Sequence, residues 1–240
     1  MKTILIQGAM DCEIDELIEF YKPKQTKTIG GFKFWICENQ DSKIIISKTD
    51  VGIINATTAT TIAVLKFKPD IVINQGCAGS AIKDINPGKI IVGESAIYIN
   101  HFNTPLTEKG GKSDSLKWPP NTKRSYKIQS SEHLVELAKQ LENSETFHFG
   151  ILGSGDIYNR EYDRICHLQN LFGHMCEDME SIAVFKVCEN FGVDRIGFRV
   201  ISNNELNKTD LDKSTTKISQ KLAIDFVDLF LKQTNEIWKK

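Results

Sequence analysis

Three polar positions close to apolar runs could carry chemistry. Glu13 follows the run "TILIQ", Glu180 lies in the polar stretch "CEDMES", and Asn203 ends the stretch "RIGFRVISN". A carboxylate can take a proton from water or stabilise a developing positive charge. Asparagine donates and accepts hydrogen bonds but has no titratable proton to give. Whether the three side chains act together depends on the elements that position them.

The hydrophobic pattern predicts alternating strands and helices. Strands are expected at 3–7, 70–76, 89–99, 147–152 and 195–202, with an antiparallel pair at 31–38 and 43–48. Helices are expected at 11–21, 55–67, 130–143, 179–192 and 215–238. This alternation is typical of a parallel or mixed sheet covered by helices on both faces. Ligands of such sheets bind beyond the carboxyl ends of strands, where the polar positions fall.

Length and composition are those of a soluble α/β protein. The chain has 240 residues, of which 40% are hydrophobic and 25% charged, and its formal net charge is −1. We expect one domain over residues 1–240, with a proline- and glycine-containing surface excursion at about 103–127. The scattered basic residues do not favour binding to nucleic acid or to a membrane. The first apolar run is too short for a signal peptide, so a cytoplasmic location is expected.

The cysteines do not form a recognisable metal or disulfide pattern. None of the six lies in a C-x-x-C pair, which is typical of reduced thiols packed as small hydrophobic residues. The segment 166–176 combines two cysteines with two histidines, but its spacing is not that of a zinc site. We predict no metal and no cofactor.

Several stretches, taken in order, resemble the nucleoside phosphorylase/nucleosidase superfamily. They are "GAMDCEI", "KPDIVINQGCAGS", "PGKIIVGESAIY", "GSGDIYN", "EDMESIAVFKVCENFGV" and "FRVISN". Each stretch alone is weak, but together they span nearly the whole chain. Within the superfamily, the 5′-methylthioadenosine/S-adenosylhomocysteine nucleosidases are the most similar branch.

The resemblance implies a fold, an assembly and a reaction. The fold is a three-layer αβα sandwich around a central mixed, partly barrel-like sheet, and the assembly is a homodimer. The reaction is hydrolysis of the bond between ribose and a purine base. Departure of the purine gives the sugar oxocarbenium character, which a nearby carboxylate stabilises.

The resemblance also assigns roles to individual residues. Glu13 is expected to activate water, Glu180 to bind the ribose hydroxyls, and Tyr158 to stack on the purine. Ser202 and Asn203 would serve the leaving base. Further residues expected beside the substrate are Ala9, Val51, Cys77, Ala78, Gly79, Asn159, Asp178, Met179 and Arg199.

Water is favoured over phosphate as the nucleophile. Related bacterial phosphorylases carry an arginine where this chain has Asn74, and a phosphate-binding serine where it has Cys77. A phosphorylase needs cationic or amide-rich contacts to phosphate. Arg199 remains, but the hydrolases also have an arginine there. With two anion contacts missing, we predict hydrolysis.

Asn203 is the main departure from the family, in which an aspartic acid protonates purine N7. An amide cannot supply that proton, so hydrolysis of adenine nucleosides is expected to suffer. The amide suits a 6-oxopurine, but in the flipped orientation it could also bind adenine. Leu106 falls near the aromatic residue that caps the 5′ substituent in relatives, so recognition of that group also differs.

Three hypotheses follow. The first is a nucleosidase for 5′-methylthioadenosine and S-adenosylhomocysteine. The second is a nucleosidase or phosphorylase for inosine or guanosine on the same fold. The third is a nucleoside-binding protein in which Asn203 impairs catalysis. Asn203 could also be a substitution made for structural work, since an acid-to-amide change traps substrate.

Overall fold

The computed structural model describes residues 1–38, 42–121, 127–141 and 146–237. The strands are β1 (Lys2–Gly8), β2 (Gln25–Ile29), β3 (Phe32–Glu38), β4 (Ser42–Lys48), β5 (Ile71–Ser80), β6 (Ile90–Tyr98), β7 (Lys127–Gln129), β8 (Phe147–Ser154), β9 (His174–Asp178) and β10 (Asp194–Asn203). The α-helices are α1 (Asp15–Tyr21), α2 (Ile53–Phe67), α3 (Glu132–Ala138), α4 (Tyr162–Phe172), α5 (Ser181–Phe191) and α6 (Thr215–Ile237). Short 3-10 helices lie at Asp11–Glu13, Ser115–Lys117, Lys139–Leu141 and Glu205–Asn207.

The strands form one mixed sheet that closes partly on itself. Strands β10, β6, β8, β9 and β5 pair in that order, and β5 pairs with β10 to complete a five-stranded barrel. From β5 the sheet continues openly through β1, β4, β3 and β2. β5 runs parallel to β1 and β10, whereas β9 runs antiparallel to β5. The expected mixed, partly barrel-like sheet is confirmed.

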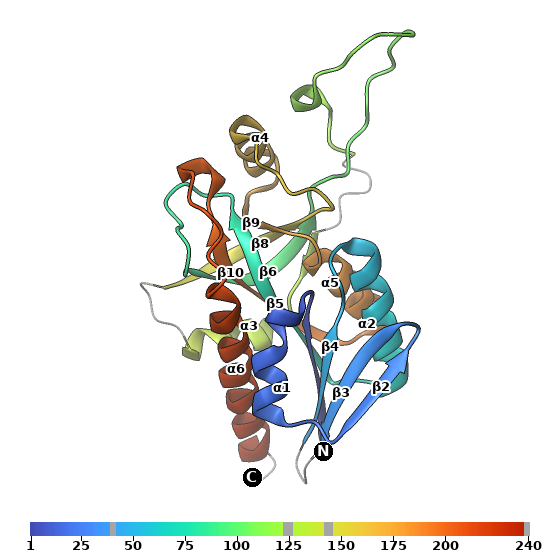
Figure 1. Cartoon of the computed structure of the whole chain (residues 1–240), viewed down its shortest axis with the longest axis vertical. Coiled ribbons are helices and arrows are strands. Elements are labelled where there is room, and N and C mark those ends of the chain that lie inside the picture. The colour runs from blue at the N-terminus through green and yellow to red at the C-terminus, as the bar shows by residue number, and fades with distance from the viewer. Residues whose placement is uncertain (39–41, 122–126, 142–145, 238–240) are drawn as a thin grey trace.

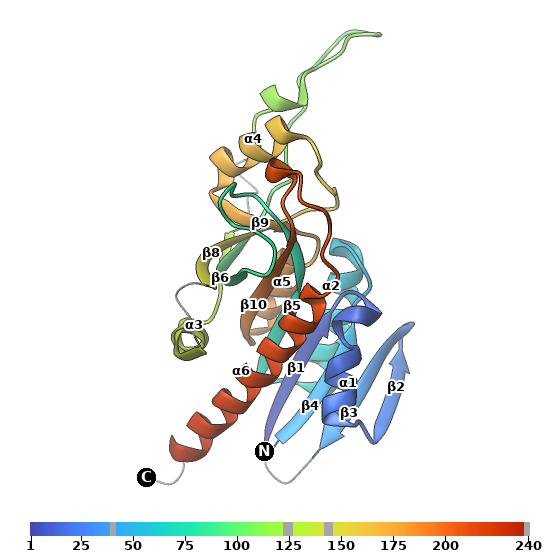
Figure 2. The same cartoon turned by 60° about the vertical axis from the view of Figure 1, so that its left-hand side comes forward.

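Helices cover both faces of the open part of the sheet (Figure 1). Alternate residues of a strand point to opposite faces, so Ile4 and Ile6 of β1 pack in the core under α1 and α6. Leu5 points the other way, into the core that α2 and α5 share with β4 and β5. In Figure 2, α6 runs the length of its face, and the barrel strands stand beside its N-terminal end. The expected αβα layering is confirmed.

Several elements differ from the expectation. The expected helix 11–21 is divided at Ile14 into a 3-10 turn and α1, and β5 continues through Gly76–Ser80 instead of ending at residue 76. β5 extends because its last residues pair with β9. The strands β2, β7 and β9 and the helix α4 were not predicted. α4 and β9 fall in the segment considered above for metal.

The excursion expected at 103–127 is described as far as residue 121, and 122–126 lie outside the described residues. Its described part projects from the body of the molecule (Figure 1) and is mostly exposed, with Leu106 at its full exposure. A bridge between Phe102 and Pro120 closes the base of the loop. In the described parts of the chain, no helix is long and apolar enough to cross a membrane.

Candidate active site

Glu13 is held by the backbone of two strand ends. It lies in the 3-10 turn after β1, and its side chain is buried. One carboxylate oxygen accepts from the N–H groups of Ala9 (2.7 Å) and Met10 (3.2 Å), and the other accepts from the N–H of Cys77 (2.9 Å). Three backbone donors therefore fix the position of this carboxylate and face its negative charge.

Strand β5 passes close to the carboxylate of Glu13 at Gly76. A Cβ at Gly76 would lie 2.7 Å from Glu13 Oε1, so glycine is needed for this approach. Gln75 ties the site to α6, because its Nε2 donates to the Glu13 carbonyl (2.6 Å) and its Oε1 accepts from Ser219 Oγ (2.7 Å). Sequence reasoning missed both residues: Gln75 lies within the stretch "KPDIVINQGCAGS" but was given no role, and Ser219 lies outside the motifs.

A buried ion pair supports the second carboxylate site, at the junction of β9 and α5. Arg199 Nε lies 3.0 Å from Asp178 Oδ2, and both side chains are almost fully buried. Asp178 also accepts from Ser154 Oγ and Ser181 Oγ and from the N–H groups of Glu180 and Ser181. Burial opposes its charge, but Arg199 and these hydrogen bonds lower the pKa of Asp178.

Arg199 is committed to the protein interior. Its NH2 group donates to Asn74 Oδ1 (2.5 Å), and NH1 donates to the carbonyls of Asn74 (3.2 Å) and Phe198 (2.9 Å). Asn74 is itself buried. These contacts leave neither side chain exposed toward a ligand.

Glu180 lies next to the ion pair of Arg199 and Asp178, but fewer contacts stabilise its negative charge. Arg199 NH2 is 4.0 Å from Glu180 Oε2, and the N–H of Gly52 donates to Glu180 Oε1 (3.0 Å). Burial, and then the charge of Asp178, raise the pKa of Glu180 from 4.5 to about 7. Gly52 precedes α2, and its neighbour Val51 is exposed beside the carboxylate.

Asn203 has a defined orientation at the end of β10. Its Oδ1 accepts from Ser202 Oγ (3.0 Å), and its Nδ2 donates to Tyr158 OH (3.2 Å) and Glu205 Oε1 (3.3 Å). This network assigns the amide oxygen and nitrogen. The N–H side therefore faces the same pocket as Tyr158.

That pocket gathers many of the predicted residues. It is lined by Gly79, Ser80, Ile157, Tyr158, Asn159, Ile165, Glu177, Asp178, Met179, Asn203 and Glu205. Glu13, Glu180, Arg199 and Ser202 are buried and do not line this pocket. Ala9 and Cys77 contact Glu13 through their N–H groups. The Ala78 side chain packs in the hydrophobic core.

Glu205 is a pocket residue that sequence reasoning missed. It opens the 3-10 turn Glu205–Asn207, where the side chain of Asn204 accepts from the N–H of Leu206 (3.1 Å). Asn204 also donates to the carbonyls of Ile82, Lys83 and Ile85, so it is structural. The available signal was an acid two residues beyond Asn203 in "ISNNE".

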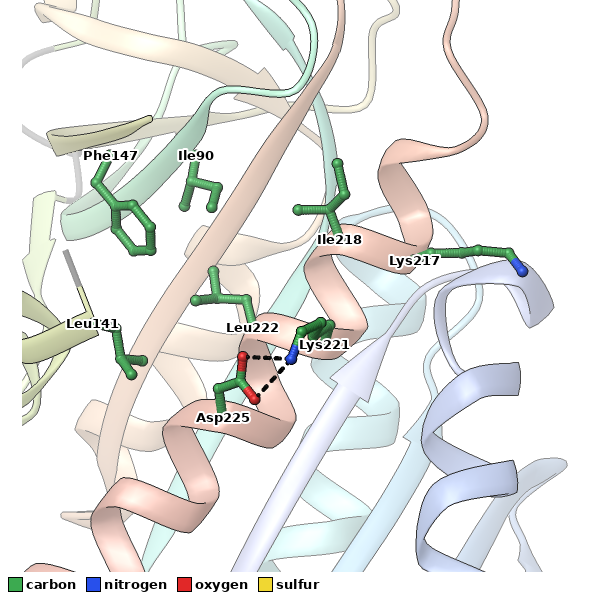
Figure 3. A pocket seen from close by; sticks show the side chains of 8 residues that line it. All are labelled: Ile90, Leu141, Phe147, Lys217, Ile218, Lys221, Leu222 and Asp225. Carbon is green, nitrogen blue, oxygen red and sulfur yellow. Dashed lines mark hydrogen bonds and ion pairs between the residues drawn. The ribbon is translucent and has the colours of Figure 1, made fainter. Parts of the chain in front are cut away.

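A larger cavity lies between α6 and the first residues of β6 and β8 (Figure 3). Its lining is mainly apolar, with Ile90, Phe147 and Leu222, and Lys221 on its rim is paired with Asp225. None of the predicted site residues lines it. Six of the predicted residues line the smaller pocket around Asn203 instead.

Comparison with known families defines the class of protein. The profile of the phosphorylase superfamily matches residues 3–232, and the chain belongs to this superfamily. The resemblance drawn from the sequence motifs is thus confirmed.

The most similar proteins include nucleosidases. A 5′-methylthioadenosine/S-adenosylhomocysteine nucleosidase from Buchnera aphidicola subsp. Schizaphis graminum is 28% identical over 232 residues, which are 95% of each chain. A second from Shewanella loihica is 29% identical over 213 residues, or 86% of this chain and 88% of its own.

Solved structures agree with this placement. A Helicobacter pylori nucleosidase, an aspartate-to-asparagine variant with 5′-methylthioadenosine in its active site, has a TM-score of 0.81 and 26% identity. That match covers 95% of this chain and 99% of the other. Helicobacter pylori futalosine hydrolase has the same TM-score and identity, covering 95% of this chain and 97% of its own.

Proposed function

We propose that this chain hydrolyses the N-glycosidic bond of purine nucleosides of the 5′-methylthioadenosine and S-adenosylhomocysteine type, releasing the free base and the ribose moiety. Proteins named as such nucleosidases are similar to this chain over 95% and 86% of its length. The observation that carries the proposal is the buried carboxylate of Glu13, which is fixed by three backbone N–H groups.

In this mechanism the two buried carboxylates have separate tasks. Glu13 takes a proton from the attacking water as the water adds to the anomeric carbon. Glu180 binds the ribose hydroxyls, and its negative charge stabilises the oxocarbenium character of the sugar. Met179 packs beside the ribose, and Tyr158 stacks on the purine. Asp178 and Arg199 position Glu180 instead of touching the substrate, because their polar atoms are used within the protein.

Water, and not phosphate, is the proposed nucleophile. A phosphate ion needs donors that it can reach, and the guanidinium of Arg199 is buried against Asn74 and Asp178. Cys77 offers a thiol that is hydrogen-bonded to Thr215 (3.2 Å), and burial raises its pKa to about 12. A neutral thiol provides little attraction for an anion.

We further propose that the chain acts as a homodimer in the cytoplasm. The excursion presents the fully exposed Leu106, and Ile54 and Leu65 are exposed along α2. An interface with a second copy would bury these apolar side chains. A cytoplasmic location is consistent with the free state of all six cysteines.

The decisive experiment measures release of free base from 5′-methylthioadenosine, S-adenosylhomocysteine, inosine and guanosine, each with and without phosphate. We expect adenine release from the first two at a rate independent of phosphate. Ribose 1-phosphate products, with a rate that rises with added phosphate, would identify a phosphorylase. Base release from inosine or guanosine alone would refute the proposed substrate class.

A further inference from the structure

The leaving purine needs a proton, and Asn203 cannot supply one. We propose that Glu205 donates this proton, acting as the general acid of the reaction. The inference rests on the proposed hydrolysis and assigns a catalytic role that the chain's motifs do not indicate. It is carried by the position of Glu205 in the pocket, in contact with both Asn203 and Tyr158.

The contacts place the Glu205 carboxyl next to the base position. Glu205 Oε1 accepts from Asn203 Nδ2 (3.3 Å) and from Tyr158 OH (3.2 Å). Its side chain lines the pocket and is 16% exposed. An acid must lie within hydrogen-bond reach of the atom that it protonates, and Glu205 lies about one hydrogen bond from the residue expected to contact N7.

The other carboxyl groups of the pocket are already committed. Glu177 accepts from Asn159 Nδ2 (2.5 Å) and lies 3.3 Å from His174 Nε2. Asp178 is paired with Arg199 and accepts four further hydrogen bonds. Glu205 is the pocket carboxyl that contacts both Asn203 and Tyr158 at the expected position of the base.

The proposed step conserves protons and electrons. As the bond between C1′ and N9 breaks, its electron pair remains with the purine, and the proton of Glu205 passes to N7. Water adds to C1′ and gives its proton to Glu13. The products are neutral purine and the free sugar, with Glu205 ionised and Glu13 protonated. Exchange of protons with solvent then restores both groups.

This assignment gives Asn203 a task that an amide can perform. As Glu205 loses its proton, Asn203 Nδ2 and Tyr158 OH donate to the carboxylate that forms, which stabilises the transition state. Arg160 Nε, 3.4 Å from Glu205 Oε2, also faces this charge from the segment before α4. The opposing charges that line the pocket are those of Glu177 and Asp178.

The test compares Glu205→Gln with the wild type on two substrates. On 5′-methylthioadenosine we expect kcat to fall by about 10²-fold or more, the usual contribution of a general acid. On 4-nitrophenyl 5-methylthioriboside, whose leaving group departs without a proton, we expect a change below about threefold. Asp210→Asn, which alters an exposed acid in the same segment, is the matched control and should leave both rates unchanged.

One further measurement separates catalysis from structure. Adding Asn203→Asp to Glu205→Gln should restore kcat on 5′-methylthioadenosine to within about tenfold of wild type, because an acid then stands at the strand end.

The outcomes are distinguishable. Absence of base release by the wild type would reject the proposed function itself. If the wild type is active and Glu205→Gln retains its kcat on 5′-methylthioadenosine, Glu205 is not the acid. An equal loss on both substrates, with no recovery in the double variant, assigns Glu205 a structural role and also overturns the proposal.

Discussion

Replacing Glu180 by glutamine should stabilise the fold at neutral and alkaline pH while impairing catalysis. Burial and the nearby charge of Asp178 raise the pKa of Glu180 from 4.5 to about 7. Its ionised form is thus unfavourable in the folded protein, and glutamine removes that charge while keeping the shape. The Gly52 N–H can still donate to the amide oxygen.

The linkage fixes both the sign and the size of the effect. Below about pH 4.5 the folded and unfolded states both hold the proton. As pH rises toward 7 the unfolded state releases it and the folded state retains it, so the free energy of unfolding falls. The rise in the pKa of Glu180 from 4.5 to about 7 corresponds to a loss of about 3 kcal/mol in the free energy of unfolding. Glutamine should recover up to this amount above pH 7 and almost none near pH 4.

Urea unfolding at a series of pH values from about 4 to 9 measures this difference directly. Glu13→Gln is the matched control. Both carboxylate oxygens of Glu13 accept hydrogen bonds from backbone N–H groups, and the amide nitrogen of glutamine would place a donor against one of these donors. We expect that control to lose stability. A Glu180→Gln difference that is constant with pH, or that favours the wild type above pH 7, would refute the reasoning.

Three other predictions concern catalysis and assembly. Glu13→Gln should lower kcat by at least about 10²-fold and leave nucleoside affinity within about tenfold, as measured by turnover and calorimetry; near-normal kcat would remove Glu13 from the mechanism. Gly76→Ala should reproduce this loss, because its Cβ would lie 2.7 Å from Glu13 Oε1; an unimpaired variant would show that the position of Glu13 is not critical. Leu106→Asp should weaken a dimer seen by light scattering, and a fully active wild-type monomer at micromolar concentration would contradict the proposed assembly.

Much of the fold could be predicted because its signals are local. The apolar runs of β1 and β6 and the helical spacing of α2, α5 and α6 depend on residues close in sequence. The closure of the barrel could not be predicted in this way. It requires β9, whose residues His174 and Asp178 are polar but buried. Asp178 is compensated by Arg199 and Ser154, which come from elsewhere in the chain.

The candidate site shows the same division. Glu13, Glu180 and Asn203 could be named from motifs, as could contacts such as Cys77 and Tyr158, whereas Ser219 and Glu205 could not. Glu205 reaches Asn203 because the chain turns at Asn204, whose side chain is anchored to the segment 82–85 more than a hundred residues away. A contact that depends on such an anchor leaves no periodic or spacing signal.

Asp178 and Glu180 lie on either side of Met179, and the structure shows why their pKa values differ. Arg199 lies 3.0 Å from Asp178 but 4.0 Å from Glu180. Asp178 also receives four hydrogen bonds, and its pKa is lowered despite its burial, whereas the pKa of Glu180 is raised. Active sites typically contain neighbouring carboxyl groups whose environments shift their pKa values in opposite directions. In the proposed mechanism, Arg199 stabilises the charge of Asp178, whereas the charge of Glu180 is favoured by the bound ribose and the developing oxocarbenium.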